Sequence, residues 1–91
     1  MKNQEEIKTR LLQEGYTDIN VYDDPANEEF PDHNHEGDQL LVVLKGSIAV
    51  KMNGKDHMLK EKDEFFFPAK VLHGAKVGAE GCLYIVGENK I

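Results

Sequence analysis

Three of the four histidines in this sequence have a spacing that suits metal binding. His33 and His35 are two residues apart on an extended segment, and side chains at i and i+2 of a strand point to the same face. His73 begins a later strand in which Lys76 must face water, so the opposite parity, which includes His73, faces inward. Imidazole nitrogens are common ligands of divalent metals. These residues therefore suggest one metal ion held inside a barrel.

A structural role for these histidines stays open at this point, because a pair of histidines two apart also arises by chance. His57 follows a turn and has no ligand spacing, so we interpret it as structural or exposed. Cys82 is expected to be a small buried residue of the apolar core. If it lined a pocket it could instead be a soft ligand or a target of oxidation. Glu36 and Asp38 have the opposite parity and flank a predicted turn, so we expect them to face solvent.

The elements that position the histidines begin with a short helix over residues 3–14. Asn3 can cap its first turn, Ile7 and Leu11 form one apolar stripe, and Gly15 is a natural stop. After Gly15 the apolar period changes from that of a helix to that of a strand.

Short strands with turn residues between them make up the rest of the chain. Asn53-Gly54 stands between two alternating runs and is a strong hairpin signal. A turn or bulge is expected at Gly46, and turns are expected at 53–54 and at 78–81. The expected strands are 19–21, 30–35, 39–45, 47–52, 55–60, 64–67, 72–77 and 82–86. No helical pattern lies between them, so seven or eight strands predict an all-β antiparallel sandwich or barrel, with a jelly roll as one option.

Length and composition predict one small soluble domain over residues 1–91, with a helix and lead-in at 1–18 and a barrel at 19–88. The formal net charge of -6 makes nucleic acid an unfavourable partner. One cysteine excludes an intrachain disulfide, and the polar N-terminus does not resemble a signal peptide. No apolar run is long enough to cross a bilayer. We therefore expect a cytoplasmic protein without a membrane partner.

Two motifs in the chain resemble those of the cupin family. The first is His33-Asn34-His35 followed by Gln39 and Gly46, where cupins carry HxH, a Glu and a Gly. The second is residues 68–73, which resemble PxGxxH, with Asp63 where an Asp often precedes the strand. The resemblance covers roughly residues 24–88. It implies a cupin-type, jelly-roll-like antiparallel β-barrel behind the short N-terminal helix.

The resemblance also implies a ligand set of His33, His35, His73 and Gln39 for one divalent ion, which would be Zn, Fe, Mn, Ni or Cu. Gln39 stands where cupins carry Glu, so it offers a neutral oxygen, and Gln39→Glu is expected to tighten metal binding. Alternatively, Gln39 leaves the metal and hydrogen-bonds a neighbour. Lys62 and Lys70 replace motif glycines, and Val77 replaces an Asn.

The function implied is that of a metal-binding cupin with a pocket for a small molecule, and the family allows oxygenase, isomerase or lyase chemistry. A non-catalytic binding or sensing module, or a barrel without metal, is the alternative. We also expect a homodimer. If Gln39, Leu41 and Val43 face inward, then Leu40, Val42 and Leu44 face outward as an apolar stripe that something must cover. A second copy would cover it; the chain's own N-terminal segment is the other candidate.

Overall fold

The N-terminal helix lies close to its predicted range. A computed structural model describes residues 4–89, and in it α1 covers Gln4–Gln13. Ile7 and Leu11 are its buried residues, as their spacing predicts. Gly15 has a φ of +102°, which suits glycine, and it follows the end of the helix. Asn3, the predicted cap, lies outside the described residues.

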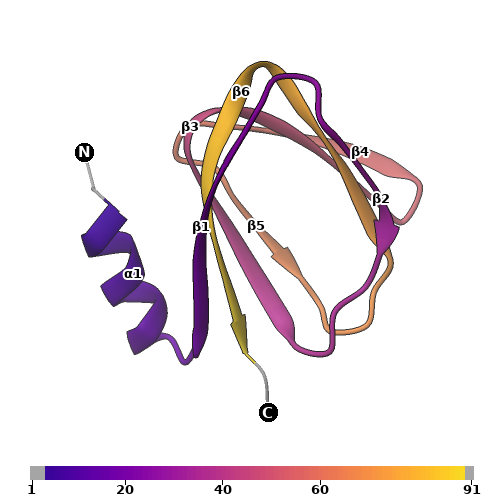
Figure 1. Cartoon of the computed structure of the whole chain (residues 1–91). Helices are drawn as coiled ribbons and strands as arrows, with labels where there is room; N and C mark the ends of the chain where they lie inside the picture. The colour runs from indigo at the N-terminus through magenta and orange to yellow at the C-terminus, as the bar shows by residue number, and fades with distance from the viewer. Residues whose placement is uncertain (1–3, 90–91) are drawn as a thin grey trace.

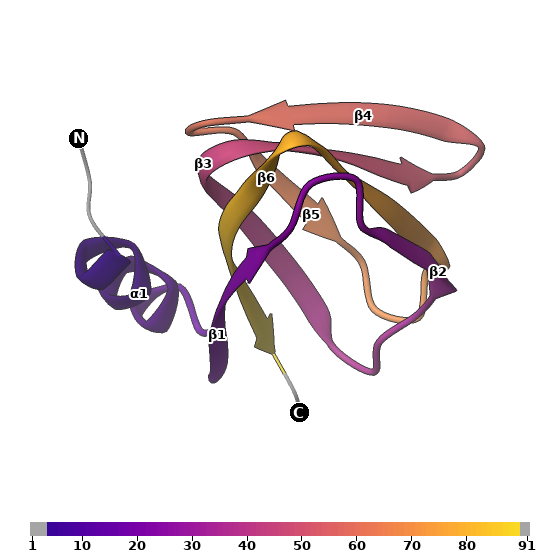
Figure 2. The ribbon, with the colours of Figure 1, turned by 45° about the horizontal axis from the view of Figure 1, so that its top comes forward.

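The strands form one antiparallel sheet that rolls up into a barrel (Figure 1). β3 and β6 pair at its centre, β1 and β2 both pair with the other edge of β6, and β4 and β5 both pair with the other edge of β3. Figure 2 shows β4 lying across one end of the roll. Among residues 4–89, no helix has the length and apolar character needed to cross a membrane. The strands are β1 (Asp18–Asp24), β2 (Glu29–His33), β3 (Asp38–Met52), β4 (Lys55–Lys60), β5 (Glu64–Phe67) and β6 (His73–Asn89).

Two glycines bend the central strands. The turn predicted at residues 78–81 is wrong, because β6 runs through it. Of the two alternatives at Gly46, the bulge is confirmed, because β3 continues through this residue with a shifted register. Gly46 and Gly81 have φ values of +81° and +80°. A Cβ on Gly46 would overlap the carbonyl oxygen of Gly81. The register of the pair shifts on both sides of Gly46, and such bulges bend a strand. The seven or eight predicted short strands are therefore six, two of them long and bent.

The short hairpin between β3 and β4 is confirmed. Asn53 and Gly54 have φ values of +55° and +75°, as the primed turns of two-residue hairpins require. Met52 pairs with Lys55 across the turn. At the next turn the Asp63 carboxylate accepts a hydrogen bond from the backbone N–H of Lys60 at 2.9 Å, which holds the chain entering β5. Both turns form from residues close together in sequence.

Replacing Lys62 with glycine is expected to stabilise the protein by about 0.5–1 kcal/mol. Lys62 is exposed and has a φ of +78°, a conformation that costs a residue with a Cβ roughly 1–2 kcal/mol; the greater backbone entropy of unfolded glycine offsets part of the gain. Lys51→Gly, at an exposed strand position of β3, is the matched control and should destabilise by a similar amount. Urea denaturation measures both, and a destabilised Lys62→Gly variant would contradict the prediction.

The sheet separates two apolar clusters. The cluster on its inner face contains Leu41 and Val43, as the predicted parity requires. On the outer face Val42 is 3% exposed and packs with Ile7 and Leu11 of α1. The predicted outward stripe is confirmed, and the chain's own N-terminal segment covers it. The alternative cover, a second copy of the chain, is therefore not needed at this stripe. Half-buried Leu40 and Leu44, and Ile19 and Val21 of β1, belong to the same cluster.

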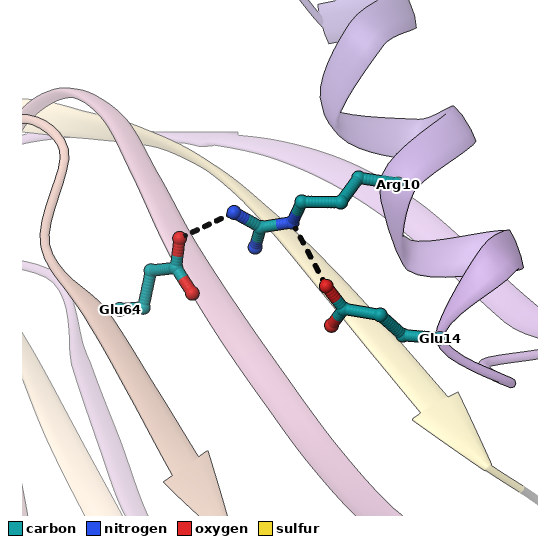
Figure 3. A network of polar contacts seen from close by, with 3 residues as sticks. All are labelled: Arg10, Glu14 and Glu64. Carbon is teal, nitrogen blue, oxygen red and sulfur yellow. Dashed lines mark hydrogen bonds and ion pairs between the residues drawn. The ribbon is translucent and has the colours of Figure 1, made fainter.

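A polar contact ties α1 to the sheet beside this outer cluster. Arg10 donates from Nη1 to a carboxylate oxygen of Glu64, at the start of β5, over 2.7 Å (Figure 3). Its Nε lies 3.4 Å from a carboxylate oxygen of Glu14, one helical turn further on. Glu64 raises the pKa of Arg10, so the guanidinium keeps its charge. Ile7 and Leu11 already attach the helix to the sheet by apolar packing. The ion pair with Glu64 fixes how the helix is oriented on it.

Candidate metal centre and pocket

Three histidine side chains converge at one end of the barrel. His33 ends β2 and pairs directly with His73, the first residue of β6, while His35 follows two residues after His33. Their ring centroids are 4.6–5.2 Å apart in every combination. One nitrogen of each ring lies within 4.8 Å of the others. The strand pairing thus brings together residues that are 38–40 positions apart in sequence.

Backbone carbonyls fix the orientation of two of these rings. Nδ1 of His33 lies 2.8 Å from the carbonyl oxygen of Pro31, and Nδ1 of His73 lies 3.2 Å from that of Val71. A carbonyl oxygen only accepts, so Nδ1 carries a hydrogen in both rings, and in the neutral tautomer that this selects, Nε2 has the lone pair that a metal needs. Burial, and then His33, lower the pKa of His73, which favours its neutral form. Neutral imidazoles with a free nitrogen are the state that binds a metal.

A second loop fixes the segment that carries the first two histidines. The backbone N–H of Lys70 donates to the carbonyl of His35 at 2.8 Å, and that of Ala69 donates to Asp38 at 2.7 Å. Lys70 has a φ of +66°, the backbone state that glycine adopts most easily. Lysine therefore occupies a glycine-type turn here, which agrees with its place in the second motif.

Gln39 lies beside the histidines and is held by Glu88. The two residues pair across β3 and β6, and both are buried. The amide nitrogen of Gln39 donates to a carboxylate oxygen of Glu88 over 3.0 Å, and the backbone N–H of Gly37 donates to the other oxygen over 3.3 Å. Since a carboxylate only accepts, the Gln39 nitrogen must face Glu88, and its carbonyl oxygen remains for another partner.

Glu88 was missed by the sequence reasoning, although a signal was present. The inward residues of β6 alternate from Cys82 through Tyr84 and Val86, and the next position in this series is Glu88. The expected strand 82–86 ends two residues before Glu88, so the sequence places Glu88 within the barrel range 19–88 but assigns it to no strand face. Continuing the alternation by two residues would have placed a carboxylate on the inner face.

The histidines open onto a cavity of about 240 Å³. Phe67 forms part of its wall, with its ring centroid 4.2 Å from that of His73. Besides Gln39 and the histidines, polar groups come from Asp24, Tyr22 and Tyr84. The remaining lining residues are Phe30, Leu41, Ile48, Val50, Ala75 and Val86. The cavity is therefore a small and mostly apolar chamber with polar groups in a few places.

The other candidates do not join the histidine cluster. His57 is half-buried and packs on Phe65, with ring centroids 4.8 Å apart, which agrees with a structural role. Cys82 is buried in the inner apolar cluster, and burial, followed by Asp24, raises the pKa of its thiol to about 11. A thiol with so high a pKa is a poor ligand and nucleophile at neutral pH. Glu36 and Asp38 are exposed, as expected.

The sequence matches the family model described as the Cupin domain over residues 20–86. No curated protein matches the chain. Among solved structures, an RmlC-like cupin from Shewanella frigidimarina has a TM-score of 0.72 at 25% identity, and the alignment covers 84% of this chain and 68% of that one. A protein of unknown function from Streptococcus pyogenes has a TM-score of 0.73 at 20% identity, covering 80% and 63% of the two chains.

An enzyme is also among the similar structures. The DMSP lyase DddQ from Ruegeria pomeroyi has a TM-score of 0.74 at 22% identity. The match covers 79% of this chain but 37% of the lyase, and 63% of the Streptococcus protein. This chain thus spans less than two thirds of either protein, and the similarity concerns the fold.

Proposed function

The chain belongs to the cupin domain family, and from this premise we propose that it binds one divalent metal ion through His33, His35 and His73 and holds a small molecule against it. The observation that carries the proposal is the convergence of three imidazole nitrogens on one point, with Nδ1 of two rings already used by carbonyls. In metal sites, a hydrogen bond from the ring nitrogen that does not bind the metal orients the histidine. Three protein nitrogens leave coordination positions for a ligand.

Gln39 is proposed as a fourth ligand through its carbonyl oxygen. Glu88 supports this role, because its carboxylate accepts one hydrogen from the Gln39 amide and another from the backbone N–H of Gly37. Glu88 also supplies one negative charge close to a site whose other groups are neutral. A bound cation would act as a Lewis acid on an oxygen of the small molecule. The chain's own residues would orient that molecule, with the apolar wall of the cavity in contact with it.

Metal analysis of protein purified without a histidine tag tests the proposal. We expect about one equivalent of a divalent metal, retained on gel filtration. Iron, manganese, nickel or copper would favour oxygenase chemistry, and zinc would favour lyase or isomerase chemistry. Protein without metal that also fails to bind added Zn²⁺ or Co²⁺ in calorimetry would contradict the proposal.

Gln39→Glu alone is expected to gain little metal affinity, contrary to the simple charge argument from the sequence. Glu88 lies 3.0 Å from the Gln39 amide nitrogen, so the variant would set two carboxylates against each other. Gln39→Glu combined with Glu88→Gln keeps the total charge. It also restores the hydrogen bond, with the amide at position 88 now donating to the carboxylate at position 39. Unit charges ~4 Å apart interact by about 4 kcal/mol at an effective dielectric of ~20. Moving the carboxylate to the metal should thus tighten binding at least about tenfold.

Calorimetric titration with Zn²⁺ compares the four proteins of this cycle. Equal affinity in the double variant and the unmodified protein would show that Gln39 does not bind the metal. A large gain in Gln39→Glu alone would show that Glu88 lies too far from the site to matter.

The homodimer remains a proposal, and it now needs a surface other than the covered outer stripe. Phe66, Met58 and Leu72 are 48%, 69% and 54% exposed, so apolar surface is still available on β5, β4 and the loop before β6. Light scattering at micromolar concentration tests it. Twice the chain mass of 10.3 kDa would confirm the dimer, and a mass of 10.3 kDa would show that the cover by α1 suffices.

We propose the cytoplasm as the compartment. The buried Cys82 is the single cysteine of the sequence, and the net charge is -6. A chain without disulfides fits a reducing compartment, and its negative charge disfavours contact with nucleic acid.

A further inference from the structure

One polar pair stands apart from the histidines in the cavity wall. Tyr84 lies four residues before Glu88 on β6, on the same face and roughly 13 Å away at ~3.3 Å per residue. Its hydroxyl donates to Oδ2 of Asp24 over 2.5 Å. Tyr22 pairs with Tyr84 across β1 and β6 and stacks on it at 5.4 Å. All three side chains line the cavity that the histidines enter.

The hydrogen-bonding capacity of this pair is restricted. The carboxylate of Asp24 only accepts, and the single hydrogen of the Tyr84 hydroxyl is already donated to it. Burial, and then Asp24, raise the pKa of Tyr84, so the phenol keeps this hydrogen at neutral pH. The lone pairs that remain on both groups can only accept. A group that meets this pair must therefore be a donor.

The rest of the cavity limits the size and charge of an occupant. Its 240 Å³ equals the space of about eight water molecules at ~30 Å³ each, so a ligand of similar atom number fits. Leu41, Ile48 and Val86 also line the cavity and offer no hydrogen bonds. At the other end, the ligands are neutral and Glu88 supplies one nearby negative charge. A divalent ion therefore keeps part of its charge uncompensated, which favours an anionic oxygen ligand.

These constraints define a class of ligand, and the inference rests on the proposed metal site. We propose that the pocket binds a short organic anion whose carboxylate meets the metal and whose far end carries a hydroxyl or ammonium group that donates to Asp24 and Tyr84. An apolar chain of a few carbons joins the two ends. Asp24 and Tyr84 thereby determine which ligand is preferred, while the metal held by the histidines binds the carboxylate that all ligands of this class share.

Spectroscopic titration of the Co²⁺-loaded protein tests this class without any assumption about a reaction. The probes are ω-hydroxy and ω-amino acids with chains of three to five carbons, each beside the alkanoate that carries a methyl group in place of the donor. Visible absorption of Co²⁺ reports binding of the carboxylate. At the best-fitting length, both donor-bearing acids should bind about tenfold more tightly than the alkanoate, as expected for a hydrogen bond to a charged acceptor.

Asp24→Asn separates this inference from a general loss of fold. The oxygen of the introduced amide would accept from Tyr84, and its nitrogen would present two hydrogens to the cavity. The ammonium preference should therefore disappear, while the hydroxyl acid, which can also accept, still binds. Asp23→Asn is the matched control, because Asp23 is exposed on the other face of β1 and loses the same charge. It should keep both preferences.

The outcomes distinguish the two proposals. Equal binding of all three probe types at every length, or equal loss of the ammonium preference in Asp23→Asn and Asp24→Asn, would overturn the role of the pair while leaving the metal site intact. Absence of a Co²⁺ spectrum in the unmodified protein would overturn the metal site, and the ligand class with it.

Discussion

Alanine in place of His73 is expected to weaken metal binding by more than about a hundredfold. Loss of a group that merely orients a ligand already costs about 10–100-fold in affinity, and His73 would be a ligand itself. It is also the buried member of the three, at 6% exposure, so its ring is the least free to be replaced by water. His57→Ala removes a histidine that packs on Phe65 outside the cluster and should leave the affinity unchanged.

Calorimetry with Zn²⁺ and the metal content after purification both measure this effect. Retention of one tightly bound equivalent in His73→Ala would show that the metal is held elsewhere. Circular dichroism of the metal-free variant checks that the barrel still forms, so that a loss of binding is assigned to the ligand and not to unfolding.

Alanine in place of Gly46 is expected to destabilise the fold by about 3 kcal/mol or more. The φ of +81° alone costs a residue with a Cβ roughly 1–2 kcal/mol. The added Cβ would also overlap the carbonyl oxygen of Gly81, which is backbone and cannot move aside cheaply. The two central strands would have to separate at their bend.

Gly54→Ala isolates the second contribution. Gly54 has a similar φ of +75°, but a Cβ there meets nothing within 4 Å. Urea denaturation of both variants should therefore show a loss of about 1–2 kcal/mol at Gly54, from the backbone conformation alone, and a clearly larger one at Gly46. Equal losses would mean that the strands tolerate the wider spacing and that the close approach does not hold the bend.

The sequence predicted features that depend on neighbouring residues and missed those that depend on distant ones. Asn53-Gly54 specifies its hairpin locally, so its position was correct. At Gly46 the sequence left a turn and a bulge open, and at Gly81 it predicted a turn that does not form. A positive φ serves a turn and a bulge equally well, and only the pairing of β3 with β6 decides between them. The histidine cluster was predicted correctly because the strand parity of its members and the spacing of the two motifs can be recognised in the sequence itself.

The contacts around the site show the same limit. Gln39 meets Glu88 across 49 positions and Tyr84 meets Asp24 across 60. Each of these four residues has an ordinary side chain, and no local pattern marks it as a partner of the other. Their roles follow from the barrel alone, since the register of the strands decides which side chains face each other.

The pairing of β3 with β6 also determines an order of assembly. Met52 pairs with His73 and Asp38 with Asn89, so the pairs are nested around the β3–β4 hairpin, and each one closes a longer loop than the last. Loop closure of this kind slows folding, because entropy is lost before distant contacts form. The hairpin should form first and pairing should then proceed outward from Met52, with α1 and β1 joining at the end. Independently of this order, α1 packs on the sheet through one apolar face, whereas β3 is paired on both edges. Amide hydrogens of α1 should therefore exchange with solvent far sooner than those of β3.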